Sequence, residues 1–180
     1  MLRLSRDESA LVLVDYQPRL MPAIHDGDAV TVRAAVLARL AGLLGVPTVG
    51  TQQSPEKLGP LDPALAASCV EVLDKTAFGA CDDGLADLLE RVRPALSQVV
   101  LAGCEAHVCL LQTALGCLAD GRQVFIVEDA CGSRAPRSKE LALARLRQAG
   151  AVVVNTEMVA FEWVRHAGHE QFRAVSALIK

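Results

Sequence analysis

The feature that most constrains the fold is a regular alternation of short apolar runs with stretches whose apolar residues recur three and four positions apart. The short runs are rich in Val, Leu and Ala and lack an in-out alternation, which is typical of strands buried on both faces. Six such runs cover residues 10–14, 46–51, 70–73, 99–102, 124–127 and 151–155. Helices between successive strands require crossover connections, so we predict an α/β fold with a parallel sheet covered by helices on both faces.

Local signals predict where the helices begin and end. Gly45 ends the first helix, and Asp82 or Asp83 is expected to cap the second. Thr156 is expected to cap a late helix, and a short helix follows Gly168. Pro and Gly residues predict a loop over 52–63 and another over 130–137. The expected helices cover residues 28–45, 85–92, 108–118, 139–148 and 157–166.

Length and charge limit the classes of protein that fit. A chain of 180 residues fits a single domain over 1–180. The formal charge of −3, without a basic patch, argues against nucleic acid as the main partner. No apolar run is long enough to span a bilayer, and residues 1–8 turn acidic without a signal-peptide core, so we expect no membrane association and a cytoplasmic location.

Six cysteines could suggest three disulfides, but their spacing does not fit a disulfide framework or a zinc site. They form no C-x-x-C pair, and most lie inside apolar segments. We therefore expect all six to be reduced and five of them to be packing residues. The six are Cys69, Cys81, Cys104, Cys109, Cys117 and Cys131.

The remaining cysteine, Cys109, follows a sharp turn from strand to helix. The apolar run 99–102 ends at Gly103, and helical spacing begins near Val108, so Cys109 falls in or near the first helical turn. Unpaired backbone N–H groups and the helix dipole favour a thiolate there, and a thiolate is a nucleophile. The alternative interpretation is a small buried hydrophobic residue.

Three reactive side chains follow strands that are distant in the sequence. Asp15 follows the first predicted strand, Lys75 the third, and Cys109 the fourth. Ligands of open α/β sheets bind at the carboxyl ends of strands, so the three could meet at one edge. A carboxylate can accept the thiol proton, and an ammonium can orient the carboxylate and stabilise the thiolate. Taken singly, Asp15 could be a polar strand end and Lys75 a solvated charge.

The segments around Asp15, Lys75 and Cys109, together with others, resemble the isochorismatase-like cysteine hydrolase superfamily, which includes nicotinamidases and N-carbamoyl amide hydrolases. The resemblance covers nearly the whole chain and is carried by residues 11–17, 74–79 and 103–109, with Gln112-Thr113 after them. The likeness is greatest to isochorismatase domain-containing hydrolases of undefined substrate. The further segments that carry it are 51–55 with Leu58-Gly59, and Ser133-Arg134.

The resemblance implies a three-layer Rossmann-like fold with a six-stranded parallel sheet, and an Asp-Lys-Cys triad carried onto Asp15, Lys75 and Cys109. It also implies a turn at Cys104 and Glu105, with a cis peptide between them, whose N–H groups bind an oxyanion together with that of Cys109. The expected activity is hydrolysis of a small-molecule carbonyl compound, most simply an amide-type C–N bond, through a covalent thioester. The alternatives are a vinyl ether hydrolase and a non-catalytic binding or scaffold protein on the same fold.

Departures from the superfamily pattern refine these expectations. Nicotinamidases bind a metal through histidines after the second strand, but residues 52–57 contain none. We therefore expect no metal and no cofactor, and nicotinamide is a poor candidate substrate. Isochorismatases that cleave a vinyl ether lack the cysteine, so Cys109 favours acyl chemistry. Gln52-Gln53-Ser54 departs from a Glu-Gln-Tyr pattern in similar hydrolases, so Gln53 is a candidate for altered substrate preference.

Other polar and aromatic residues near these motifs are candidate substrate contacts. Besides Gln53, they are Gln17, Phe78, Glu105 and His107. Each has a structural alternative: a loop polar group, a core aromatic ring, a hydrogen bond within the turn, or a helix cap. His166 and His169 are three apart but separated by Gly168, which argues against a metal pair. Helices rich in Leu and Ala and the resemblance to oligomeric proteins predict a homo-oligomer, at least a dimer.

Overall fold

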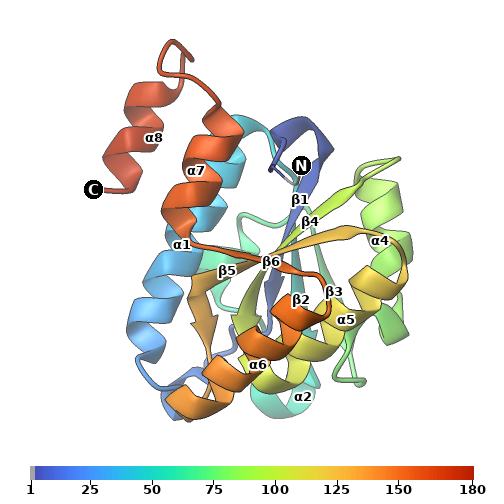
Figure 1. Ribbon diagram of the computed structural model, residues 1–180. Helices are drawn as coiled ribbons and strands as arrows, with labels where there is room; N and C mark the ends of the chain where they lie inside the picture. The colour runs from blue at the N-terminus through green and yellow to red at the C-terminus, as the bar shows by residue number, and fades with distance from the viewer. Residues whose placement is uncertain (1–2) are drawn as a thin grey trace.

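A computed structural model describes residues 3–180 of the chain. Within these residues, six parallel strands form one sheet in the order β3-β2-β1-β4-β5-β6 (Figure 1). The strands are β1 (Ser9–Val14), β2 (Thr48–Gln53), β3 (Glu71–Lys75), β4 (Gln98–Cys104), β5 (Gln123–Gly132) and β6 (Val152–Val154). The predicted α/β class, with its six-stranded parallel sheet, is confirmed.

Helices cover both faces of the sheet, which gives three layers (Figure 1). On one face lie α1 (Gly27–Leu44), α7 (Thr156–Val164) and α8 (Phe172–Leu178), and on the other α4 (Leu85–Val92), α5 (Leu111–Ala119) and α6 (Pro136–Gln148). Successive side chains of a strand point to opposite faces, so Leu11 and Leu13 of β1 join the first core, and Val12 and Val14 the second. This double burial explains why β1 shows no polar alternation.

Short segments complete the fold at the strand ends. They are the 3₁₀ turns η1 (Arg6–Glu8), η2 (Met21–Ala23) and η3 (Ala80–Asp83), the short helices α2 (Pro55–Leu58) and α3 (Pro63–Ala66), and a π-helical turn η4 (Ala106–Leu110). Among residues 3–180, no helix is both long and apolar enough to cross a bilayer.

The two central strands, β1 and β4, mark the point where the strand order reverses. A crevice forms outside the carboxyl ends of such strands. Gly103 of β4 pairs with Val14 of β1, and a Cβ at Gly103 would lie 2.4 Å from the Val14 carbonyl oxygen. Only glycine permits this approach, which brings the end of β1 close to the turn after β4.

Several predicted boundaries are wrong. Polar residues Gln52 and Gln53, expected in a loop, pair with β3 as the end of β2, and β5 continues to Gly132. Gly84, rather than Asp82 or Asp83, stands at the start of α4, because Asp83 binds the backbone of the preceding loop. Asn155 caps α7 in place of Thr156. The end of α1 at Gly45, in the left-handed region, is confirmed.

Candidate active site

Asp15 is the first residue after β1 and is fully buried. Its φ of 56° is in the left-handed region, where Asp is more tolerated than most residues. Its backbone N–H bonds to the Thr51 carbonyl at 3.2 Å, and the Thr51 hydroxyl donates to its Oδ1 at 2.7 Å. These contacts with the neighbouring strand β2 orient the Asp15 carboxylate and leave its second oxygen, Oδ2, for other partners.

Lys75 is the last residue of β3, two strands away from Asp15. Strands are about 4.8 Å apart, so only a long side chain can cross the end of β2, and the Lys75 ammonium lies 2.7 Å from Asp15 Oδ2. Both side chains are completely shielded from solvent. Within residues 3–180, Oδ2 has this ion pair but no well-aligned hydrogen-bond donor, so it can accept a proton.

The Lys75 ammonium is held by further acceptors. It donates to Gln53 Oε1 at 2.6 Å, and it lies 3.3 Å from the Ala77 carbonyl oxygen and 3.2 Å from that of Phe78. These oxygens replace the water that the buried side chain has lost. Its position is therefore fixed by both strand β2 and the loop that follows β3.

Cys109 lies in the η4 turn after β4, with 6% of its surface exposed. Its Sγ is 3.9 Å from Gln53 Oε1, the same atom that accepts from Lys75. The pKa of Cys109 is raised to about 12, first by burial and then by the Asp15 charge, while the Lys75 charge opposes both. Burial and the Asp15 charge therefore oppose the thiolate that the helix start was expected to favour.

Gln17 and Gln53, both predicted substrate contacts, bind each other. Gln17 donates to the carbonyl oxygens of Gln53 at 3.0 Å and Gly59 at 2.5 Å, and accepts from Gln53 N at 2.8 Å. The Gln53 side chain also donates to the Thr76 carbonyl at 2.8 Å. Both amides are engaged inside the protein, and they position the acceptor shared by Lys75 and Cys109.

The turn after β4 is held by an ion pair. The Cys104–Glu105 peptide is cis, as expected, and the Cys104 side chain packs in the core. Glu105 is buried and accepts from Arg134 Nη2 at 2.5 Å and Nε at 2.9 Å. These bonds hold the pKa of Glu105 below its usual value. The Glu105 carboxylate is thus directed to the loop after β5, to which His107 also bonds through Ser133 Oγ at 3.0 Å.

Phe78 lies on the loop that surrounds the Lys75 ammonium, with 52% of its surface exposed. This exposure is incompatible with the alternative of a core aromatic ring. The same loop is held by Asp83, which accepts from Thr76 N at 2.6 Å and Ala77 N at 2.9 Å. Those two bonds hold the pKa of Asp83 below its usual value.

The structure therefore brings Asp15, Lys75 and Cys109 to one edge of the sheet, with Gln53 between them. Sequence reasoning missed Thr51, Asp83 and Arg134, which orient the site. Thr51 could have been found from its register, because it pairs with Val14 immediately before Asp15. No sequence signal pointed to the partners of Arg134 or Asp83.

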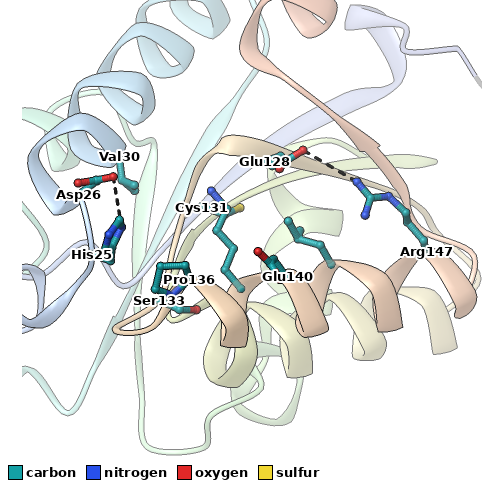
Figure 2. Close-up of a pocket in the computed structure, with 11 residues that line it drawn as sticks. His25, Asp26, Val30, Glu128, Cys131, Ser133, Pro136, Glu140 and Arg147 are labelled. Atoms are coloured by element: carbon teal, nitrogen blue, oxygen red, sulfur yellow. Dashed lines mark ion pairs between the residues drawn. The ribbon is translucent and has the colours of Figure 1, made fainter.

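A separate cavity of about 340 Å³ lies between the start of α1 and α6 (Figure 2). Its lining carries charges of both signs, since Arg147 lies 3.9 Å from Glu128. His25 Nδ1 also lies 3.2 Å from Asp26 Oδ2. None of the predicted site residues lines it. Figure 2 shows Ser133, the partner of His107, at its wall.

Within the described part of the chain, no group of three or more His, Cys, Asp or Glu side chains is placed to hold a metal ion. The rings of His166 and His169 are 6.0 Å apart, and His169 Nε2 lies 2.5 Å from an Arg6 nitrogen. All six cysteines are free, as expected.

Comparison with known proteins assigns the family. Residues 9–158 match the isochorismatase domain. The chain is 40% identical to isochorismatase domain-containing protein 2 of Bos taurus over 172 residues, which are 96% of this chain and 83% of that protein. A MAR1 ribonuclease structure from Caenorhabditis elegans is 32% identical, with a TM-score of 0.91 over 99% of this chain and 92% of that one.

Two YcaC structures are each 27% identical, with TM-scores of 0.90. That from Pseudomonas aeruginosa, described with hexane-2,5-diol and covalent acrylamide, matches over 98% of this chain and 91% of that one. The structure from Escherichia coli, described as an octameric hydrolase of unknown specificity, matches over 99% of this chain and 90% of that one. The match to the domain model and the similarity to these proteins over 83% or more of their lengths show that this chain belongs to the isochorismatase family of hydrolases.

Proposed function

We propose that this chain is a cysteine hydrolase that cleaves an amide-type C–N bond of a small molecule through a covalent thioester on Cys109. The observation that carries the proposal is the buried Asp15 carboxylate, which is ion-paired to Lys75 and close enough to Cys109 to raise the pKa of that thiol. A protonated thiol must lose its proton before it can attack, and the neighbouring Asp15 carboxylate is the base that can accept it. The proposed acceptor is Asp15 Oδ2, which has no well-aligned hydrogen-bond donor among the described residues.

The proposed reaction begins with proton transfer from Cys109 to Asp15 Oδ2. The thiolate attacks the carbonyl carbon, and the carbonyl oxygen becomes an oxyanion. The C–N bond then breaks, and the leaving amine takes the proton from Asp15. Water attacks the thioester and gives a proton to Asp15, and that proton returns to the sulfur as the acid leaves. Lys75 keeps the carboxylate oriented and offsets negative charge as the thiolate forms.

Backbone N–H groups of the turn from Cys104 to Cys109 are the proposed oxyanion donors. Donors fixed in a water-excluded site stabilise a developing charge strongly, since they need no reorganisation. Glu105 and Arg134 act as positioning residues for this turn, because their ion pair ties it to the loop after β5. Phe78 and His107, which are partly exposed, remain the proposed substrate contacts.

Similar proteins support this chemistry. The Escherichia coli neighbour is described as a hydrolase, and the Pseudomonas aeruginosa neighbour carries covalent acrylamide. Covalent attachment to acrylamide is the product expected from addition of a nucleophile such as a thiol. A vinyl ether hydrolase or a non-catalytic binding protein remains an alternative, and the intact triad residues favour neither.

The name ribonuclease belongs to the Caenorhabditis elegans neighbour. For this chain, the formal charge of −3 argues against RNA, since binding of the phosphate backbone depends on Lys and Arg. We propose a small-molecule substrate, no nucleic-acid partner, no cofactor and a cytoplasmic location. The octameric neighbour supports a homo-oligomer.

A substrate screen tests the proposal. Wild type and Cys109→Ala are assayed, with EDTA present, against small amides, ureides, esters, a vinyl ether and a single-stranded RNA. We expect turnover of a C–N substrate by wild type alone. Turnover that is equal in Cys109→Ala, or cleavage of the vinyl ether or the RNA only, would overturn the assignment.

A further inference from the structure

Two cysteines outside the candidate active site lie in contact. Cys81 of η3 and Cys117 of α5 have their sulfur atoms 3.7 Å apart, although 36 residues separate them in the chain. Neither is bonded to another sulfur. A disulfide needs a sulfur separation of about 2.05 Å, so the two atoms must approach by roughly 1.6 Å to form one.

The surrounding packing holds the pair together. Gly116 of α5 faces Cys81 so closely that a Cβ there would lie 2.8 Å from both Cβ and Sγ of Cys81. The Ala80 N–H donates to Thr113 Oγ1 at 3.0 Å, and Cys81 Sγ lies 3.7 Å from the Thr113 carbonyl oxygen. The turn η3 is therefore anchored on α5 at Ala80 and at Cys81 itself, which keeps the thiols adjacent.

The two thiols are chemically different. Cys81 is partly exposed, whereas Cys117 is buried. The hydrogen bond from Cys117 lowers the pKa of Cys81, and the same bond raises the pKa of Cys117. The accessible sulfur is thus the better nucleophile, and the buried one lies where a resolving thiol is needed. The charged neighbours of Cys81 are Asp82 and Asp120, which oppose this effect, and Arg122, which assists it.

We propose that Cys81 and Cys117 form a redox modification site, a dithiol that hydrogen peroxide converts to an intramolecular disulfide. Cys81 attacks the peroxide oxygen, the O–O bond breaks, and a sulfenic acid forms with release of water. Cys117 then attacks the Cys81 sulfur, its proton leaves with the hydroxyl group as a second water, and the S–S bond forms. Hydrogen peroxide is reduced by two electrons and the two thiols are oxidised by two. The site does not depend on the proposed hydrolase activity.

Peptide mapping tests this site directly. The native full-length protein is treated with hydrogen peroxide, free thiols are blocked, and the protein is digested with trypsin. Cys81 falls in peptide 76–91, and Cys117 falls in peptide 92–122 together with Cys104 and Cys109. We expect these peptides to become linked with loss of two hydrogen atoms, and fragmentation to place the link between Cys81 and Cys117. Dithiothreitol should reverse it.

Matched variants identify the partner thiol. Cys109→Ala should form the link as wild type does. Cys117→Ser should lose it and accumulate a sulfenic acid on Cys81, trapped by dimedone, although Cys104 and Cys109 remain on the same peptide. A link through Cys104 or Cys109 would overturn the proposal. Oxidation of Cys81 in wild type to a sulfinic or sulfonic acid, with Cys117 still a free thiol that is alkylated after unfolding, would also overturn the proposal.

Discussion

The Lys75 ammonium lies 2.7 Å from Asp15 Oδ2, and neither side chain is exposed to solvent. Removal of one charge from such a pair leaves the other buried without compensation, which costs more than a surface ion pair would. The two charges also act on Cys109 in opposite directions, since Asp15 raises the pKa of the thiol and Lys75 lowers it. The opposite effects of Asp15 and Lys75 on the pKa of Cys109 can be measured before any substrate is known.

The alkylation rate of Cys109 should therefore respond oppositely to the two substitutions. Wild-type Cys109 should react slowly up to high pH, because its pKa of about 12 is far above the reference of about 8.5. Asp15→Asn should move the alkylation profile to lower pH, and Lys75→Met should move it to higher pH. Iodoacetamide labelling followed by peptide mass spectrometry measures the profiles. Shifts of the same sign in both variants would contradict the account.

Gln17 should matter for stability because its amide satisfies two buried backbone groups of Gln53 and the partly buried carbonyl of Gly59. Gln17→Leu leaves those groups without partners, which should cost about 2 kcal/mol in the free energy of unfolding. Urea unfolding measures the loss. Gln148→Leu, at an exposed position of α6, is the matched control and should change stability by less than about 0.5 kcal/mol. Equal effects would refute the role of the Gln17 amide.

Glu105 should make stability depend on pH. Because the Arg134 bonds lower its folded pKa, the stabilisation is present above the unfolded pKa and is lost as pH falls through the folded value. Glu105→Gln should lower the melting temperature by a few degrees at pH 7, and the difference from wild type should shrink below about pH 4. Thermal unfolding across this range measures it. A difference that is constant with pH would show that the charge plays no part.

Large apolar side chains remain exposed on the outer helices, including Leu141 of α6 and Met158 and Phe161 of α7. We expect a homo-oligomer that buries part of this surface. Sedimentation velocity over a concentration series should give a species of at least twice the chain mass of 19.1 kDa. A single species near the chain mass throughout the series would exclude it.

The core was largely predictable from the sequence, because buried strands such as β1 and amphipathic helices such as α4 leave a hydrophobic signal. The strand ends were not. Gln52 and Gln53 continue β2, and Glu128 to Gly132 continue β5, with polar or small residues that read as loop. Their strand pairing comes from neighbours far away in sequence, which a local pattern does not contain.

The candidate site was likewise predictable only in part. Asp15, Lys75 and Cys109 could be grouped because each stands at the end of a recognisable strand or after it. The contacts that orient them could not, since the reach of Lys75 across β2 and the pairing of Gln17 with Gln53 depend on side-chain geometry. The raised pKa of Cys109 was also not predicted, because the helix start favoured a thiolate and the extent of burial depends on the tertiary packing.

Intact-protein mass spectrometry during turnover of a substrate found by the screen tests the central claim most directly. We expect an acyl adduct on Cys109 that appears during turnover and is absent in Cys109→Ala, which should have no activity. Asp15→Asn should form it at least about 10²-fold more slowly, since the general base is lost. An active Cys109→Ala protein, or an adduct on Cys81 or Cys104, would contradict the account.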